Sequence, residues 1–392
     1  MYADAMTAPT FLGYVRTNGD VGIRNYLLVL SIAGLTGPAA RRVVRALPGA
    51  RLVSMPYGGG LIGEDLAVHL RSLAGFGRNP NVGGVLLIGS DPPKVAALAA
   101  EIGANGKPVA AICLDDCGHD VLTLTDRALR AGARLHKDIS RQRRQPVPLA
   151  KLFVGMECGR SDPSSGMVAN PLIGSFVDAL IQLGGRAVFG ETLEWLGAEH
   201  LLARRAATAA VSDALVQAVL RRESVATRQG LDLLGNNPGP TNIAAGLSTI
   251  EEKSLGSIAK SGSSEIMGVL GIGETPAAPG LYAMDAPAYS PESLSGFVAS
   301  GAQMLLFSTG VGNSYVSNLA PTIKISANPE ATSTLAEQLD FDASAVFLGK
   351  QSLDEASAAL LDVVVDIASG TLTWGEILDE GDEVVSRMGE AL

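Results

Sequence analysis

Apolar runs alternate with amphipathic segments along the first third of the chain. Residues 26–33 form a continuous apolar run, typical of a strand buried on both faces of a parallel sheet. A turn rich in Gly and Pro follows, and apolar positions then recur at helical spacing. The alternation predicts strands over residues 26–33, 51–56, 84–89 and 109–114, and helices over 39–47, 64–74, 94–102 and 119–134.

The second half repeats this alternation less regularly. Residues 199–222, rich in Ala, Arg and Leu, predict one long helix, and Ser248 with Glu251 three residues later predicts a capping box that opens another. The remaining patterns predict strands over 152–155, 187–189, 280–284, 304–308 and 322–326, and helices over 172–183 and 352–369.

Chain length and one polar stretch predict two domains. A chain of 392 residues is long for a single core, and the Pro-containing polar stretch 141–148 is the predicted boundary. The predicted fold class is α/β. The first domain, residues 11–145, is expected to be a Rossmann- or flavodoxin-like, mostly parallel sheet. The second, residues 146–392, is expected to be a larger mixed α/β domain that carries most of the site motifs.

Composition excludes several classes of protein. The formal net charge of -10 argues against nucleic acid as a partner. No uninterrupted apolar run reaches the roughly 18 residues that a membrane span needs, and the first ten residues lack the basic-then-apolar pattern of a secretory signal. Three cysteines form no disulfide framework and indicate a reducing compartment. We therefore expect a cytoplasmic protein that binds neither membranes nor nucleic acid.

The loop that follows the apolar run 152–154 holds the densest group of reactive side chains. It contains a thiol, two carboxylates and an amide within a short stretch that leads into a helix. A strand, a polar loop and a helix in this order present reactive groups at the carboxyl edge of an α/β sheet. A Gly-rich turn with ordinary caps is the less favoured interpretation, because a turn needs none of these groups. The side chains are those of Glu157, Cys158, Ser161, Asp162, Ser164 and Asn170.

Two further stretches contain charged candidates near predicted strands. Arg24 and Asn25 lie beside a Gly-rich turn, and Arg is suited to bidentate binding of a carboxylate. A β-hairpin with surface arginines explains that stretch equally well. Glu191 comes directly after the strand 187–189, where catalytic carboxylates occur, and Glu194 lies three residues on.

The glycine loop 57–60 precedes a predicted helix, where backbone N–H groups can bind an anion. It is not a Walker motif, because no Gly-Lys-Ser/Thr follows. Asp65 is more simply a partner of the helix dipole, and the role of Glu64 stays open.

The remaining candidates lie on loops of the second half. Thr241 and Asn242 occupy a Gly/Pro loop, and Thr309 lies in the polar loop 308–313, which is either a ligand loop or a plain turn. Lys253 lies near a predicted helix N-terminus, where a cation is disfavoured. It therefore either pairs with a neighbouring Glu or points into a site.

Taken together, these stretches resemble the catalytic large region of the altronate/galactarate dehydratase family over residues 11–350. The matching segments, in order, are Gly-Asp-Val-Gly-Ile-Arg-Asn, Glu-Cys-Gly-x-Ser-Asp, Ala-Asn-Pro, Gly-Ala-Glu-His, Ile-Glu-Glu-Lys-Ser-Leu-Gly and Ser-Thr-Gly-x-Gly. The family includes sugar-acid dehydratases and the large subunit of sulfolactate sulfo-lyase. The segments Phe-Leu-Gly-Tyr, Pro-Tyr-Gly, Phe-Gly-Glu-Thr and Glu-His-Leu are closest in pattern to the sulfo-lyase branch.

The chain departs from the dehydratases at several positions. Those enzymes tend to have cysteines where this chain has Leu35, Gly59 and residues 91–93, a Lys near Ile243 and an Arg at Val311. If those thiols bind iron in the dehydratases, this protein cannot bind it in the same way. The sulfo-lyase branch similarly lacks them, and this chain retains only Cys158.

The resemblance implies a lyase that eliminates water or sulfite from a small 2-hydroxy or sugar acid. Such a reaction needs a base for the α-hydrogen, and a divalent metal (iron, manganese or magnesium) or Arg/Lys and backbone donors for the aci-carboxylate. The expected residues for proton transfer or metal contact are Cys158, Asp162, Glu191 and Lys253, and those for substrate binding are Arg24, Asn25, Ser161, Asn170, Thr241, Asn242 and Thr309.

The resemblance also implies partners for this chain. We expect a small acidic substrate, a separately encoded small subunit with a SAF-like domain, and an oligomer, without a nucleotide cofactor. The metal ligands stay open. The alternative is a non-catalytic ligand-binding or regulatory paralogue, which the loss of the cysteines, the Lys and the Arg would also suit.

Overall fold

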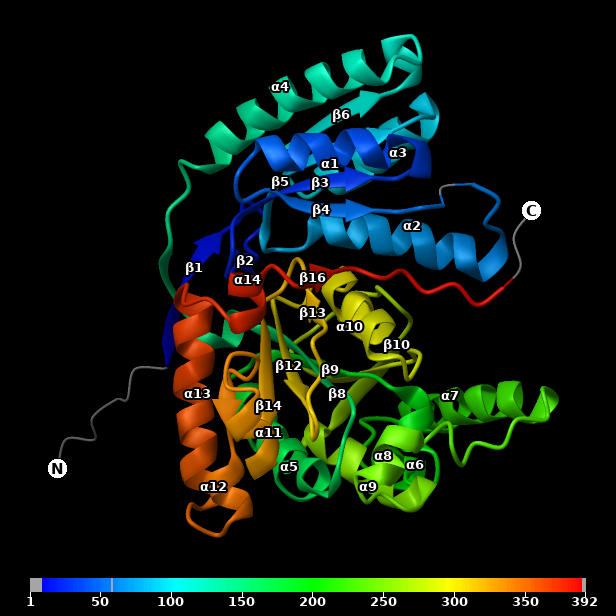
Figure 1. The fold of residues 1–392 in the computed structure, drawn as a ribbon, viewed down its shortest axis with the longest axis vertical. Helices are drawn as coiled ribbons and strands as arrows, with labels where there is room; N and C mark the ends of the chain where they lie inside the picture. Colours follow the sequence, from blue (N-terminus) through cyan, green and yellow to red (C-terminus); the bar gives the residue numbers. More distant parts are fainter. Residues whose placement is uncertain (1–8, 58, 390–392) are drawn as a thin grey trace, which may run out of the picture.

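The computed structural model describes residues 9–57 and 59–389 (Figure 1). Two α/β domains lie one above the other in this view, and the red C-terminal segment runs between them. Most of the N-terminal stretch examined for a secretory signal, and one glycine of the loop 57–60, lie outside the described residues.

The first domain is a four-stranded parallel sheet with the order β4-β3-β5-β6. This is the strand order of flavodoxin-like folds. Alternate residues of β3 face opposite layers, with Leu27 and Val29 towards α1 and α4 and Leu28 and Leu30 towards α2 and α3. The elements are β3 (Tyr26–Ser31), β4 (Arg51–Ser54), β5 (Val82–Gly89), β6 (Val109–Cys113), α1 (Gly37–Ala46), α2 (Gly63–Arg78), α3 (Pro92–Gly103) and α4 (Val121–Ile139).

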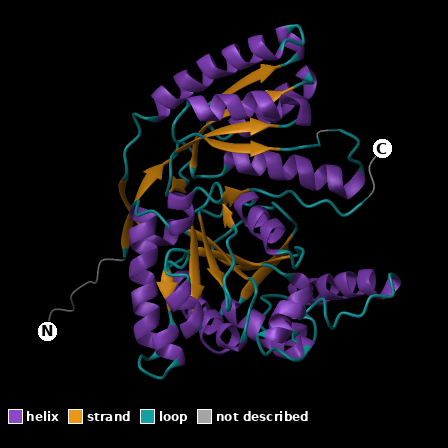
Figure 2. Ribbon diagram, in the orientation of Figure 1, coloured by secondary structure: helices purple, strands orange, loops and turns teal. Residues whose placement is uncertain are grey.

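The second domain is a seven-stranded sheet with the order β10-β11-β9-β8-β12-β14-β15, in which every neighbouring pair is parallel. The strands are β8 (Phe153–Cys158), β9 (Arg186–Phe189), β10 (Ile266–Leu270), β11 (Gly280–Met284), β12 (Met304–Ser308), β14 (Thr322–Ser326) and β15 (Phe341–Asp342). Figure 2 shows helices enclosing this sheet. The predicted two-domain α/β fold class is therefore confirmed.

The two domains share a hydrophobic core. Helix α10 (Ser290–Ala299) covers one face of the large sheet and packs against α2 of the first domain. Phe76 of α2, Phe153 of β8 and Phe297 of α10 belong to one buried cluster. The opposite face is covered by α5 (Asn170–Gln182) and α13 (Leu353–Ser369).

Short strands join the ends of the chain to this body. Strand β1 (Thr10–Val15) pairs antiparallel with β2 (Val21–Gly22) and with β7 (Gln145–Pro148). The β-hairpin interpretation of the stretch before β3 therefore describes its backbone. The predicted domain boundary falls inside β7, and β13 (Val316–Ser317) pairs with β16 (Gly381–Asp382) near the C-terminus.

Two element predictions for the second half were wrong. The helix predicted over 199–222 is divided into α6 (Glu199–Ala203) and α7 (Ala209–Arg228). The chain breaks there because Ala206 bridges to Ile266 and the Thr208 side chain caps α7 by accepting from the Val211 N–H. Helix α9 (Ile250–Ile258) is capped by Thr249, which accepts from the Glu252 N–H, one residue later than the predicted capping box.

One stretch, Leu353–Leu378, is long and apolar enough for a membrane span by length and composition alone. The helix ends at Ser369, and α14 (Trp374–Leu378) begins after a break. Leu360 and Val364 of α13 are fully buried in the core of the second domain. The stretch is therefore a core helix followed by a short separate one.

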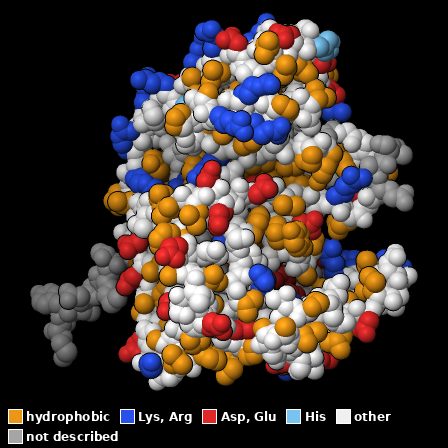
Figure 3. All heavy atoms as spheres, in the orientation of Figure 1, with side chains coloured by type: hydrophobic (Ala, Val, Ile, Leu, Met, Phe, Trp, Pro, Cys, Tyr) orange, Lys and Arg blue, Asp and Glu red, His pale blue; other side chains and the backbone are white. Residues whose placement is uncertain are grey.

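Charge is distributed unevenly over the face drawn in Figure 3. Lys and Arg side chains gather over the first domain, and Asp and Glu side chains lie mostly over the second. The net negative charge is therefore not uniform over this face, and positive potential is local.

Candidate functional site

The site is built where β8 and β9 end. These strands are parallel neighbours, with Met156 opposite Phe189, so the residues beyond their carboxyl ends meet. The Cys158 N–H donates to Glu191 Oε2 at 3.1 Å, and Cys158 Sγ lies 3.4 Å from the same oxygen. In the sheet, β8 lies between β9, the next strand along the chain, and β12, a later strand. The site therefore lies where the strand order reverses.

Glu191 is held in an unusual backbone conformation. Its φ of 65° and ψ of 53° lie in the left-handed region, which non-glycine residues seldom adopt. The following residues form a 3₁₀ turn, Thr192–Trp195, and Trp195 Nε1 donates to the Gly190 carbonyl at 2.9 Å. Such strain is retained mainly at functional positions, and here it directs the Glu191 carboxylate towards Cys158.

Helix α9 and the 3₁₀ turn after it add two lysines and a hydroxyl. Lys253, Ser257 and Lys260 recur at helical spacing, so they lie on one face. Lys260 Nζ lies 2.5 Å from Glu191 Oε2 and 2.6 Å from Ser257 Oγ, and Lys253 Nζ lies 2.5 Å from Glu194 Oε1.

Glycines allow α9 to approach so closely. A Cβ on Gly256 would lie 3.1 Å from the Cα of Gly166, and a Cβ on Gly174 would lie 2.4 Å from the Ala259 carbonyl oxygen. Larger residues at these positions would push α9 and its lysines away from Cys158.

Burial and charge set the protonation of this cluster. Burial, together with the Glu194 charge, raises the pKa of Glu191 to about 7, although both lysines oppose the shift. Burial also raises the pKa of the Cys158 thiol. It would lower the pKa of Lys260, but the surrounding thiol and carboxylates raise that pKa above its usual value. At neutral pH the cluster therefore holds a neutral thiol and a charged ammonium.

Glu157 is a further buried carboxyl group of the site, and its hydrogen-bond partner is a serine. It is fully buried, its Oε2 accepts from Ser293 Oγ at 3.1 Å, and its Oε1 has no hydrogen-bond partner among the described residues. Burial, together with the Glu191 charge, raises the pKa of Glu157 well above its usual value and so favours its protonated form.

A pocket of about 300 Å³ opens beside the cluster. Its polar wall comes from the loop after β8 and from α9, and includes Ser161, Asp162, Asn170, Lys253 and Ser257. The structure therefore brings Ser161, Asn170 and Lys253 to one cavity, as expected for a small polar ligand.

Asp162 organises the wall of this pocket. One carboxylate oxygen accepts from Ser164 Oγ and from the N–H and hydroxyl of Ser165, and the other accepts from Asn328 Nδ2 at 2.8 Å. Asn170 donates to the Gly256 carbonyl at 2.8 Å and accepts from Ser308 Oγ. Both side chains hold the loop in position through contacts within the protein.

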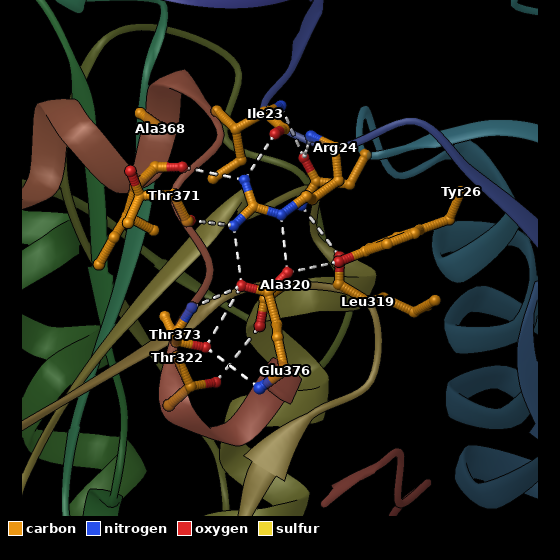
Figure 4. Close-up of polar contacts among 12 residues, drawn as sticks. Ile23, Arg24, Tyr26, Leu319, Ala320, Thr322, Ala368, Thr371, Thr373 and Glu376 are labelled. Atoms are coloured by element: carbon orange, nitrogen blue, oxygen red, sulfur yellow. Dashed lines mark hydrogen bonds and ion pairs between the residues drawn. The ribbon is translucent and has the colours of Figure 1, made fainter. Parts of the chain in front are cut away.

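Arg24 does not line this pocket, and Figure 4 shows the contacts that it makes instead. Its five N–H donors are all used, two by the carboxylate of Glu376 on α14 and three by the carbonyl oxygens of Ile23, Ile367 and Thr371. A buried guanidinium needs all its donors satisfied, so Arg24 joins β3 to the C-terminal helices and has no donor left for a substrate.

The neighbouring Asn25 is likewise engaged. It accepts from Arg16 at 2.8 Å and donates to the Ile139 carbonyl at 2.9 Å. The structure does not bring Arg24 or Asn25 to the pocket beside Cys158.

The other predicted loop residues fall into separate roles. On α8 (Pro240–Ala244), Asn242 donates to the Ser161 carbonyl at 2.9 Å and so positions the pocket wall, whereas Thr241 is exposed. Thr309 Oγ1 accepts from the Gly312 N–H at 3.0 Å, a contact within the loop that agrees with its interpretation as a plain turn.

Ser257 and Lys260 were missed by the sequence predictions. Their signal was the helical spacing from Lys253, which points three polar side chains in one direction. Glu194 carried a similar signal, because a residue three positions after Glu191 lies on the same side of a tight turn.

Cys158, Glu191 and Glu194 could together hold a metal ion. One ligand atom from each lies within 4.8 Å of the others, and all three residues are buried. A thiol with two carboxylates suits a transition-metal ion better than Mg²⁺, which prefers oxygen ligands. Both carboxylates are also paired with lysines, so an ion would share them with two ammonium groups.

The positions where the dehydratases tend to have cysteines meet in the first domain. Leu35, Gly59 and Asp91 line one pocket of about 420 Å³ at the carboxyl edge of the four-stranded sheet. No cysteine lines this pocket, and Cys113 and Cys117 of the same domain are buried and free.

The fold and the cluster define a two-domain α/β protein with a buried acid–base site at the edge of its larger sheet. Sequence models of the D-galactarate/altronate dehydratase C-terminal domain and of the second domain of D-galactarate dehydratase/altronate hydrolase match residues 149–391 and 13–140. The chain therefore belongs to the altronate/galactarate dehydratase family, as the sequence predicted.

Curated relatives agree with this assignment. The chain is 38% identical to (2R)-sulfolactate sulfo-lyase subunit beta of Chromohalobacter salexigens, over 97% of this chain and 98% of that one. It is 33% identical to altronate dehydratase of Escherichia coli, over 97% of this chain and 78% of the relative. It is 29% identical to galactarate dehydratase (L-threo-forming) of Escherichia coli, over 92% and 73%. All are lyases, and so is this chain.

Proposed function

We propose that this chain is the large subunit of an enzyme that eliminates sulfite or water from a small 2-hydroxy acid in the cytoplasm. The observation that carries the proposal is the convergence of Cys158, Glu191 and Glu194 with Lys253 and Lys260 beside a polar pocket. The relative with the highest identity among those above is named as a sulfo-lyase subunit, which favours sulfite as the leaving group.

The proposed roles follow from the contacts. Glu191 removes the α-hydrogen, because a pKa raised to about 7 suits a general base at neutral pH and the adjacent Lys260 ammonium stabilises its charged form. Lys253, whose side chain is 10% exposed at the pocket, binds the substrate carboxylate as it gains charge. Ser161 orients the substrate together with the second amide N–H of Asn170, whose other N–H and oxygen hold the loop, while Asp162 and Asn242 position the loop.

When a divalent ion is bound, Cys158, Glu191 and Glu194 would hold it, and it would supply Lewis-acid stabilisation of the aci-carboxylate. We propose iron or manganese, because a thiolate ligand disfavours magnesium.

A separate small subunit is part of the proposal. The relative named subunit beta is matched over almost its whole length, whereas the dehydratases contain further sequence. We propose that a SAF-like partner supplies the part of the site that those longer chains carry themselves.

The test is turnover by anaerobically purified chain together with its candidate partner. Sulfolactate and a panel of aldonic and aldaric acids would be screened for release of sulfite or of a 2-oxo acid, after elemental analysis of bound metal. We expect sulfite from sulfolactate. Glu191→Gln should abolish release, whereas Glu251→Gln, an exposed carboxylate on α9, should leave it unchanged. Ligand-dependent thermal stabilisation without turnover would favour the non-catalytic paralogue instead.

A further inference from the structure

A second polar pocket lies between the two domains. It has a volume of about 300 Å³ and is bounded by α2 of the first domain and by α7 and the ends of β10 and β11 of the second. It shares no lining residue with the pocket beside Cys158. Cavities between domains are frequent ligand sites.

Three arginines converge on this pocket from two domains. Arg71 belongs to α2, and Arg221 and Arg222 belong to α7. Arg221 Nη2 and Arg222 Nε share one carboxylate, that of Asp285, at 2.7 and 3.1 Å. Two cations therefore balance a single anion on the α7 side of the pocket.

Several guanidinium donors remain available to a ligand. Among the described residues, Arg221 makes one hydrogen bond, to Asp285, and Arg71 makes one, to the Ile272 carbonyl at 2.7 Å. Arg71 Nη1 also lies 3.8 Å from Glu274 Oε1, a distance that is too long for a hydrogen bond. In Figure 3, Lys and Arg side chains lie on both walls of the recess that separates α7 from the first domain.

We infer that this pocket binds a small oxyanion that bridges Arg71 of the first domain and Arg221 of the second. The planar guanidinium fork matches the paired oxygens of phosphate, sulfate and carboxylate groups. Glu64 and Asp285 also line the pocket, and Glu274 lies 3.8 Å from Arg71, so three carboxylates oppose three guanidiniums. The attraction therefore comes from the unused guanidinium donors and not from an excess of positive charge, which suits a compact oxyanion and not a polyanion.

The test is isothermal titration of the full chain with inorganic phosphate, sulfate and succinate, each at constant ionic strength set with sodium chloride. The three probes distinguish phosphoryl, sulfuryl and carboxylate ligands. We expect saturable binding of at least one of them. Arg221→Ala and Arg71→Ala should each weaken it about tenfold, the loss of one charge-assisted hydrogen bond.

The matched control is Arg130→Ala on α4. Like Arg221, Arg130 forms an ion pair and is exposed: the exposed fraction of its side chain is 70%, against 61% for Arg221. Its replacement should leave binding unchanged. Asp285 keeps Arg222 and Thr192 as partners when Arg221 is replaced, so the variant is expected to fold.

Three results would overturn the inference. The first is no saturable binding of any probe by the unaltered chain. The second is binding that survives both substitutions but is lost in Lys253→Met, which would place the anion in the pocket beside Cys158. The third is a loss of thermal stability in Arg221→Ala with unaltered affinity, which would make the arginines structural. None of these results depends on turnover, so the proposed function is tested separately.

Discussion

Charge compensation at single residues determines the state of the buried cluster. Lys260 and Glu191 both have 0% side-chain exposure, and isolated buried charges are costly. The three N–H donors of Lys260 face Glu191 Oε2, Ser257 Oγ and Cys158 Sγ, the last at 3.5 Å. Each donor therefore has an acceptor, which explains how an ammonium group persists in the core.

Replacing Lys260 with Met should strongly destabilise the protein. The substitution keeps the side-chain volume but leaves Glu191 buried without its partner, and breaking a buried pair in this way costs about 3–5 kcal/mol. Removing the second charge as well, in Lys260→Met with Glu191→Gln, should recover much of that loss without restoring turnover. Urea unfolding of the single and double variants measures the effect.

Lys94→Met is the control for this experiment. Lys94 is also ion-paired, 3.2 Å from Asp91, but its side chain is 65% exposed, and such pairs contribute about 0–1 kcal/mol. Equal destabilisation by the two lysine substitutions would show that the Lys260–Glu191 pair is not a compensated buried charge.

Local sequence context predicted only some members of the site. Glu191 and Cys158 stood out because each follows an apolar strand, and Lys253 because a cation near a helix N-terminus is unusual. Lys260 resembled an ordinary basic residue at the end of a helix. Arg24 was misleading because its partner, Glu376, lies 352 residues away, and no local pattern announces such a contact.

At the scale of elements, the C-terminal segment 379–389 connects the two domains. Tyr57 of the first domain donates to the Val385 carbonyl at 3.0 Å, and Asp65 accepts from the Met388 and Gly389 N–H groups at 2.8 Å. On the other side, the Val384 N–H donates to Ser295 of α10 at 2.8 Å. Asp65 therefore anchors this segment, a role beyond that of a helix-dipole partner.

Glu383 makes the stability of this segment depend on pH. Its buried carboxylate accepts from the Ser317 hydroxyl and from the Asn318 N–H, yet burial raises the pKa of Glu383 to about 7. As pH rises from about 4.5 to 7, the unfolded chain releases this proton first. Folding stability from this group should therefore fall across that window, by on the order of 3 kcal/mol, and the loss is complete above it.

The variant Glu383→Gln should remove this pH dependence. The thermal midpoint of the unaltered chain should be higher at pH 5 than at pH 8. This difference should be smaller in the variant, because glutamine does not ionise. Glu337→Gln, which alters an exposed carboxylate, should keep the original difference. A variant with the same pH slope as the unaltered chain would contradict the assignment to Glu383.

Elements were predictable where their own residues determine them. The predicted strands over 280–284, 304–308 and 322–326 agree with β11, β12 and β14, because each is an apolar run buried along its whole length. The break between α6 and α7 was not predictable, since it depends on the distant Ile266. Strands of two residues, such as β13 and β16, likewise exist only through their partners.

At the scale of the whole molecule, the alternation of strands and helices predicts two α/β domains but not how they meet. The contact between α2 and α10 and the course of the C-terminal segment require the folded chain. Each domain presents a pocket at the carboxyl edge of its own sheet. Asp91 and Lys94 line the first pocket, whereas the second lies beside the buried cluster of Cys158, Glu191 and Lys260.

Ending the chain after Leu378 should therefore weaken the coupling between the domains. The truncation removes the contacts of Val385, Met388 and Gly389 with the first domain and that of Val384 with α10, each worth about 1 kcal/mol. We expect calorimetry to show a lower first midpoint and two separate transitions, because domains with fewer shared contacts no longer unfold together. A chain ending at Gly389 keeps these contacts and should unfold like the full chain. A single unshifted transition in the shorter chain would show that the remaining contacts, those of α2 with α10 and of Arg24 with Glu376, are enough to couple the domains.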